Sequence, residues 1–298
     1  MFYGDAWQHQ IQSCCNESAF LRTKAALDAQ KIPIQFWQLD DWWYPGGMPS
    51  GGGVNCVDTW ELLPGPFPSG LRSLSEQLKV PWLLYAPYFC GNTSLREKFD
   101  MLVSPGGYAV PTPAKSEAFY ASLFAAKAGM TVGYEVDFMI DNHLNQPVFR
   151  EEFGAAERWL AGMNAAAIGQ NMSVQYCMAL PSDLLVSLQN NAVTNYRASD
   201  DYAGSSVTNF NLQTSSLLGW ALGLRPSKDV FYTSDNLPEN PYWRRRKPTH
   251  PTVPGVDLEL HAAIATLSTG PTAIGDGPGR TNETLIRRSC RADGCLAR

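Results

Sequence analysis

Residues 131–139 form the stretch that most constrains what this chain can fold into. The stretch is short, rich in β-branched and aromatic residues, and apolar apart from Glu135 and Asp137. This pattern is typical of a strand in a parallel sheet, because both faces of such a sheet are covered. A carboxylate close to the end of such a strand is costly to desolvate, so it needs polar partners or a chemical role. Asp137 is therefore the first candidate catalytic group.

The same succession of apolar strand, acidic or aromatic strand end, loop and helix recurs along the 298 residues. It predicts strands at residues 2–7, 32–39, 80–89, 131–139, 172–178, 192–196, 229–233 and 272–275. It also predicts helices at residues 16–30, 69–79 and 151–167. Alternating strands and helices indicate a parallel sheet, and eight such units close a barrel. We therefore expect an α/β fold, a (β/α)8 TIM barrel that occupies residues 1–298 as one domain.

The amino-acid composition limits the kinds of binding partner that we expect. A hydrophobic content of 44% and a charged content of 17% describe a core-rich globular chain. The net charge of −5 argues against a nucleic-acid partner, and no apolar run approaches the roughly 20 residues of a membrane span. We expect neither nucleic acid nor membrane as a partner, and the oligomeric state stays open.

Cysteines and glycosylation signals leave the compartment open. The seven cysteines lack the paired spacing of a zinc site, although one disulfide remains possible. Four triplets, which begin at Asn16, Asn92, Asn171 and Asn282, match the N-glycosylation signal and would permit a secretory route. Such triplets also occur by chance.

Polar residues follow several of the predicted strands, and in a closed barrel they would all point into one mouth. They are Asp40, Asp41, Asp137, Arg197, Asp200, Asp201, Asp235 and Asn236. Aromatic residues lie near the same strand ends, namely Trp7, Trp37, Trp42, Trp43, Tyr44 and Trp82. Aromatic faces cover the C–H surface of a sugar while carboxylates accept bonds from its hydroxyls. Core packing is the alternative for each tryptophan, and a magnesium or calcium site is the alternative for the carboxylates.

A pair of carboxylates beside an arginine fits the hydrolysis of a glycosidic bond better than a metal site. In that chemistry one carboxylate attacks the anomeric carbon. The other is kept protonated and protonates the leaving oxygen.

Six segments resemble the α-galactosidase and raffinose synthase clan of glycoside hydrolases. Residues 38–42 (QLDDW) resemble its DDGW motif, and residues 135–137 (EVD) resemble its KxD nucleophile motif. Residues 177–178 (CM) and 196–202 (YRASDDY) resemble the CM and RxSDDF pattern of raffinose synthases. Residues 261–279 resemble the stretch HAAxRAxSGGPxYVSDxPG, and residues 291–294 match the LPDGS segment less closely. The resemblance spans nearly the whole chain, in order.

The resemblance implies a (β/α)8 barrel and retaining chemistry on α-linked sugars without a metal or cofactor. It implies that Asp137 is the nucleophile and that Asp200 or Asp201 is the acid/base. Counting four residues on from the arginine selects Asp201, whereas aligning the SD pair selects Asp200. The substrate-binding set that we expect is Trp7, Asp40, Asp41, Trp42, Glu135, Arg197 and Asp235.

Two residues depart from the pattern of the clan. Trp42 stands in the place of a glycine and would crowd one edge of the sugar. Glu135 stands in the place of a lysine, which reverses the charge beside Asp137. Side chains alternate along a strand, so both carboxylates share one face. We expect the pKa of one of them to be raised unless a cation such as Arg197 lies between them. We expect a catalytic barrel alone here, without the β-sandwich domains that flank the barrel in the clan, and the chain can be a fragment of a longer protein.

The sequence therefore predicts a retaining α-glycosidase for a carbohydrate substrate, with α-galactosides as the expected class. One alternative is an α-galactosyl transferase of the raffinose synthase type, which forms the same covalent intermediate. A carbohydrate-binding barrel without turnover is the second alternative, and a metal-dependent hydrolase is the third.

Overall fold

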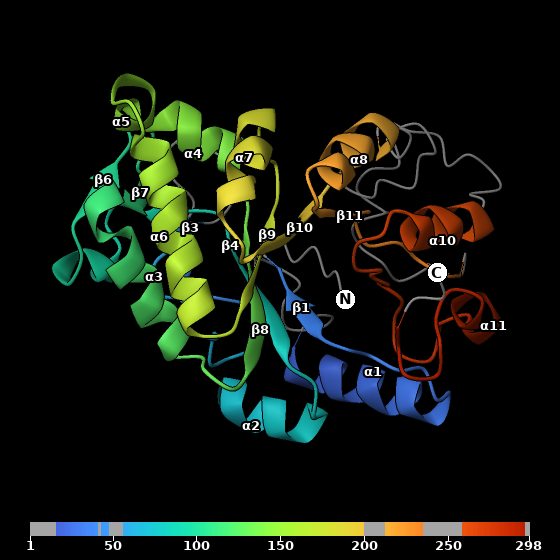
Figure 1. Ribbon diagram of the computed structural model, residues 1–298. Coiled ribbons are helices and arrows are strands. Elements are labelled where there is room, and N and C mark those ends of the chain that lie inside the picture. Colours follow the sequence, from blue (N-terminus) through green and yellow to red (C-terminus); the bar gives the residue numbers. More distant parts are fainter. Residues whose placement is uncertain (1–15, 41–42, 48–55, 200–211, 235–257, 296–298) are drawn as a thin grey trace, which may run out of the picture.

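The computed structural model describes residues 16–40, 43–47, 56–199, 212–234 and 258–295 (Figure 1). Its main sheet has six parallel strands in the order β1-β4-β8-β9-β10-β11. These strands are β1 (Trp37–Leu39), β4 (Trp82–Ala86), β8 (Thr131–Val136), β9 (Ser173–Tyr176), β10 (Val193–Arg197) and β11 (Arg225–Ser227). A further parallel bridge joins Phe231 to Ile274. The α/β class and the parallel sheet are thus confirmed, and the single domain over residues 1–298 stays a prediction.

Several predicted strand limits were wrong. The segment expected as a strand at residues 229–233 begins its pairing four residues earlier, in β11, and of the residues expected at 229–233 and 272–275 only Phe231 and Ile274 pair, in the parallel bridge. Pro226 lies inside β11 and hides it from sequence patterns, but β11 closes the strand order, where a missing N–H is tolerated. The strand of residues 131–139 ends at Val136, because Phe138 takes a left-handed conformation with φ of 51°. Residues 2–7 lie outside the described part.

A second sheet was not predicted. It has the order β2-β3-β5-β7-β6 and consists of β2 (Gly46–Gly47), β3 (Cys56–Val57), β5 (Phe89–Cys90), β7 (Tyr108–Pro111) and β6 (Met101–Val103). A disulfide between Cys56 and Cys90 joins β3 to β5. The strands have two to four residues each, which is too short for a period-two pattern to be recognised. Since β5 follows β4 after two residues, the second sheet lies next to the carboxyl end of the main sheet.

The helices follow the sequence signals at their ends. They are α1 (Glu17–Ala29), α2 (Gly70–Leu78), α3 (Ser116–Ala125), α4 (Met139–Asn145), α5 (Pro147–Glu151), α6 (Ala155–Gly169), α7 (Pro181–Val186), α8 (Leu212–Ala221), α10 (Leu258–Leu267) and α11 (Glu283–Arg287). Short 3-10 turns cover Ser94–Glu97, Pro113–Lys115 and Ser187–Gln189. The Asn16 side chain caps α1 by accepting a bond from the Ala19 N–H. The helix predicted at 151–167 begins later, because Gly154 has a φ of 76°.

The core lies between the main sheet and its helices, and aromatic rings fill much of it. Phe20 of α1 packs edge-on against Trp37 and Trp82, with ring centroids 5.4 and 5.2 Å apart. Burying rings of this size provides much of the energy that fixes α1 on the sheet.

Within the described ranges, no helix is long and apolar enough to cross a membrane.

Helices α3 and α6 pack side by side at the left of the sheet in Figure 1. Gly162 of α6 permits this approach, since a Cβ built there would lie 2.6 Å from the backbone nitrogen of Glu117 and from the Cβ of Ser116. We expect Gly162→Ala to lower the free energy of unfolding, because overpacking costs about 1–3 kcal/mol and exceeds the helix-propensity gain of about 0.5–1 kcal/mol.

The matched control is Gly169→Ala in the same helix, where the added Cβ meets nothing within 4 Å. Urea unfolding should show this variant as stable as the parent or more stable. A neutral Gly162→Ala variant would contradict the close contact between α3 and α6.

Candidate active site

The carboxyl end of β8 carries two acidic residues on one face. Glu135 belongs to the strand, and Asp137 follows its last residue, Val136. The backbone N–H of Phe138 donates to Asp137 Oδ1 over 2.6 Å, and the Asp137 N–H donates to the carbonyl of Ala86 in β4. Asp137 is 7% exposed. The left-handed turn at Phe138 thus holds this carboxylate at the strand end, directly before α4.

Amide side chains from β1 and β9 hydrogen-bond to Glu135. It is 2% exposed and accepts a hydrogen bond from the side chain of Gln38, which belongs to β1. In β9 the partner of Glu135 in the strand register is Gln175, whose side chain also hydrogen-bonds to the Glu135 carboxyl. Gln175 in turn accepts a bond of 2.6 Å from the Asn195 side chain of β10. Gln38, Glu135, Gln175 and Asn195 thus form a row of polar side chains across one face of the sheet, which we call the polar row.

The pKa of the Glu135 carboxyl is raised to about 8. Burial is the largest cause and the charge of Asp137 is the second, whereas Arg197 and the bond from Gln175 act in the opposite direction. The expectation that one of the two carboxyls has a raised pKa is confirmed for Glu135. Desolvation, rather than repulsion between like charges alone, is its main origin.

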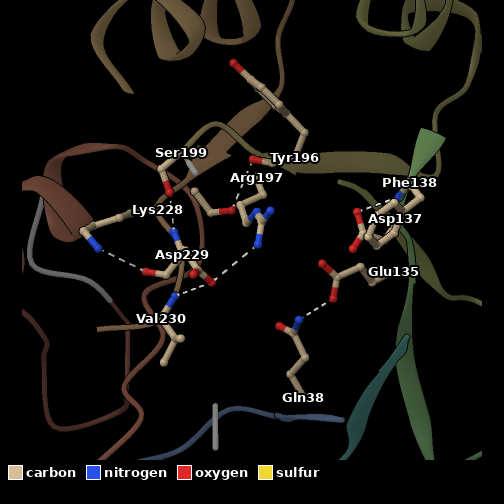
Figure 2. A network of polar contacts seen from close by, with 11 residues as sticks. Gln38, Glu135, Asp137, Phe138, Tyr196, Arg197, Ser199, Lys228, Asp229 and Val230 are labelled. Atoms are coloured by element: carbon tan, nitrogen blue, oxygen red, sulfur yellow. Dashed lines mark hydrogen bonds and ion pairs between the residues drawn. The ribbon is translucent and has the colours of Figure 1, made fainter. Parts of the chain in front are cut away.

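Arg197 and Asp229 supply the opposite wall. Arg197 ends β10, and its Nη1 atom lies 3.8 Å from Asp229 Oδ1. Asp229 is 3% exposed and is held by the loop after β11: its N–H donates to Ser199 Oγ over 2.8 Å, and the Val230 N–H donates to its Oδ1 over 2.8 Å. Figure 2 shows Arg197 between Asp229 on one side and the two carboxylates of β8 on the other.

A cavity of about 180 Å³ reaches these groups. Its polar lining includes Gln38, Asp40, Glu135, Gln175, Arg197, Lys228 and Asp229, and its apolar lining includes Ile32, Ile34, Ile274 and Ile286. Carboxylates accept hydrogen bonds, and a guanidinium donates them, so the polar part suits a ligand with several hydroxyl groups. Asp137 borders this region but does not line the cavity.

Four of the predicted site residues lie in the described part of the chain and come together there. Asp40 follows β1, Glu135 lies in β8 and Asp137 follows it, and Arg197 ends β10. The others, Trp7, Asp41, Trp42, Asp200, Asp201 and Asp235, lie outside the described residues, so their roles stay predictions.

Three of the tryptophans that were weighed as sugar-contacting walls belong to the core instead, while Trp7 and Trp42 lie outside the described residues. Trp37, Trp43 and Trp82 are at most 1% exposed, and Trp43 packs against Trp60 with centroids 5.6 Å apart. For these three, the alternative of core packing holds.

Sequence reasoning missed part of the polar cluster. Gln38, Gln175 and Asn195 sit inside short apolar strands, and a polar residue in a strand buried on both faces was the available signal. Asp229 was taken as the first residue of a strand. Cys177 follows β9, and its side chain hydrogen-bonds to Asp137, while burial raises the pKa of its thiol.

Two solved structures share this fold. A GH27 β-L-arabinopyranosidase from Geobacillus stearothermophilus matches with a TM-score of 0.65 and 14% identity, over 96% of this chain and 72% of that one. An α-galactosidase from Thermus thermophilus, in complex with stachyose, matches with a TM-score of 0.58 and 19% identity, over 95% of this chain. The chain spans 62% of the length of that galactosidase. No protein-family model and no curated protein sequence matches the chain. At these identities the similarity establishes the fold.

The raised pKa of Glu135 makes stability depend on pH. Its folded value of about 8 lies above the ordinary value of 4.5, so folding favours the protonated carboxyl. This contribution is complete below pH 4.5 and is lost as the pH rises through about 8. Glutamine has nearly the same shape as a protonated glutamate and cannot ionise. Glu135→Gln should therefore gain stability relative to the parent between pH 5 and pH 8, as urea unfolding at both values would measure.

The control for this pH effect is Glu117→Gln, which changes an exposed carboxyl of α3. Its stability difference from the parent should stay constant over the same interval. A constant difference for Glu135→Gln as well would show that Glu135 is ionised in the folded protein.

Proposed function

We propose that this protein is a retaining α-glycosidase with a (β/α)8 barrel and that α-galactoside-type sugars are its substrates. The observation that carries the proposal is the position of Asp137. It ends a central parallel strand, beside Glu135 and facing Arg197 and Asp229, in a fold shared with two glycosidases. Barrel enzymes keep their catalytic groups at these strand ends.

In the proposed reaction Asp137 is the nucleophile. Its carboxylate attacks the anomeric carbon while the bond from that carbon to the leaving oxygen breaks, and the acid/base, Asp200 or Asp201, gives its proton to the leaving group. The same acid/base then takes a proton from water, which attacks the anomeric carbon and releases Asp137. Two displacements at one carbon retain the configuration of the sugar.

Glu135 and Arg197 set the electrostatic environment of Asp137 in the proposed site. Asp137 must be ionised to attack, and a second ionised carboxylate beside it would oppose that state. A neutral Glu135 removes this repulsion and can both donate a hydrogen bond to a sugar hydroxyl and accept one. Arg197 adds a positive charge on the other side, where it supports the ionised Asp137 and can donate to a hydroxyl.

The names of the two structural neighbours guide the choice of substrate. α-D-Galactopyranosides and β-L-arabinopyranosides have the same arrangement around the ring and differ in the hydroxymethyl group at C5. Asp40, and Asp41 beside it, are proposed to accept hydrogen bonds from the ring hydroxyls. An aryl α-D-galactoside and an aryl β-L-arabinopyranoside are therefore the first pair of substrates to test. Transfer to a sugar hydroxyl would use the same intermediate, and the product formed with raffinose-type acceptors separates the two activities.

The first test of the proposal is Asp137→Gly. Loss of the nucleophile should reduce kcat by about 10⁴-fold or more. Azide should restore part of the activity by attacking the open face, and a 2-fluoroglycoside should label Asp137 in the parent protein. Peptide mass spectrometry of the labelled protein identifies the residue.

The control is Asp141→Asn, which changes a half-buried carboxylate of the next helix that has no role in the proposal. It should keep its rate within a few-fold and not respond to azide. A covalent label on any residue other than Asp137 would refute the assignment.

The acid/base is tested by comparing Asp200→Asn with Asp201→Asn. General acid catalysis contributes about 10²–10⁴-fold, and its loss matters most for leaving groups of high pKa. One variant should therefore lose activity on an alkyl or disaccharide substrate while it still forms the intermediate from a dinitrophenyl glycoside. Pre-steady-state release of dinitrophenol measures that step. The assignment fails if both variants treat good and poor leaving groups alike.

A further inference from the structure

The disulfide between Cys56 and Cys90 indicates that the chain folds in an oxidising compartment. It joins β3 to β5, with the two Cα atoms 4.8 Å apart, and both cysteines are at most 5% exposed beside Tyr88. Disulfides of this kind form and persist in oxidising compartments, where thiols are not kept reduced. In eukaryotic cells the same compartment attaches oligosaccharides to the asparagine of exposed Asn-X-Ser/Thr triplets.

At three of the four triplets, the local structure explains why an asparagine occupies the first position. Asn16 and Asn282 are helix caps, whose Oδ1 atoms accept bonds from the N–H groups of Ala19 and Leu285. Asn171 has a φ of 53°, a left-handed conformation that asparagine tolerates better than most residues. Their presence in a glycosylation triplet is therefore explained without a glycan.

Asn92 has neither of these roles. It is exposed, it is not among the described residues with positive φ, and no described contact involves its side chain. Its triplet is Asn92-Thr93-Ser94, which begins two residues after Cys90 of the disulfide. Asn92 is therefore the one asparagine of the four triplets whose presence the described structure does not explain, and it is exposed beside a disulfide.

We propose that Asn92 carries an N-linked oligosaccharide. The donor is a lipid-linked oligosaccharyl diphosphate. The Asn92 Nδ2 atom attacks the first sugar carbon, the new C–N bond forms, the C–O bond to the diphosphate breaks, and the amide loses one proton. The proposal is independent of the glycosidase function.

The folded loop requires that attachment comes before folding. Thr93 is 3% exposed, and its hydroxyl donates to the carbonyl of Asp58 over 2.5 Å. The Ser94 N–H donates to Asp58 Oδ1 over 3.1 Å, and the Thr93 N–H donates to the carbonyl of Cys90. Asp58 itself lies two residues after Cys56, so the disulfide and these bonds fix the triplet together. A transferase must therefore act on the unfolded segment, and the finished glycan projects from the exposed Asn92 side chain.

The test is to direct the full chain into the secretory pathway of a eukaryotic host and to digest all translocated chains, folded or not. After release of glycans by peptide N-glycosidase in heavy-oxygen water, the peptide that contains residue 92 should carry labelled aspartate. Asn92→Gln and Ser94→Ala should each remove this label and one step of electrophoretic mobility, whereas Ser94→Thr should keep both. Asn171→Gln is the matched control and should leave the label at residue 92 in place.

A separate measurement tests whether the glycan is attached before the disulfide forms. Cys56→Ser prevents the disulfide without altering the triplet, so occupancy at residue 92 should equal or exceed that of the parent. An unlabelled residue 92 in translocated parent chains would overturn the proposal, as would a glycan found only at the other three triplets. A fall of occupancy in Cys56→Ser would overturn the claim that attachment precedes the disulfide.

Discussion

The desolvation of Glu135 is the interaction on which the candidate site depends. A glutamate that is 2% exposed and close to Asp137 and Asp229 is held as a neutral group, with a pKa of about 8. The polar row of Gln38, Gln175 and Asn195 gives it partners without adding charge. Because amides satisfy its oxygens, the cations of the cluster, Arg197 and Lys228, remain close to Asp229, and Arg197 also lies beside the carboxyls of β8.

Sequence patterns predicted those parts of the fold whose strands are apolar and of ordinary length. The stretch at residues 131–139 and the helix capped by Asn16 were recovered because burial and capping act locally. The strand β11 was missed because Pro226 lowers strand propensity, and only its place at the end of the strand order makes the proline tolerable. The second sheet depends on pairings between segments far apart in the sequence, and no local pattern encodes those.

The candidate site was partly predictable for a related reason. Asp137 and Arg197 stand at strand ends, and strand ends of a parallel sheet converge, so their meeting follows from topology. The position of Asp229 depends on the loop after β11, where it is held by Ser199 and the Val230 N–H. The tryptophans were ambiguous because the same residue type builds sugar platforms and cores. Only the packing of Phe20 between Trp37 and Trp82 distinguishes the two uses.

The charge balance of the cluster also sets an upper pH limit on any chemistry that uses Asp137 as a nucleophile. Below about pH 8, Glu135 is neutral and lies in a buried cluster with Asp137, Arg197, Lys228 and Asp229. Above pH 8, Glu135 ionises and adds one negative charge to this buried space. The cluster can then lower its energy by taking a proton back or by admitting water, and either response weakens the nucleophile. If Asp137 is the nucleophile, as proposed, Glu135 favours activity at neutral and acidic pH, where its protonated carboxyl also offers a hydrogen-bond donor.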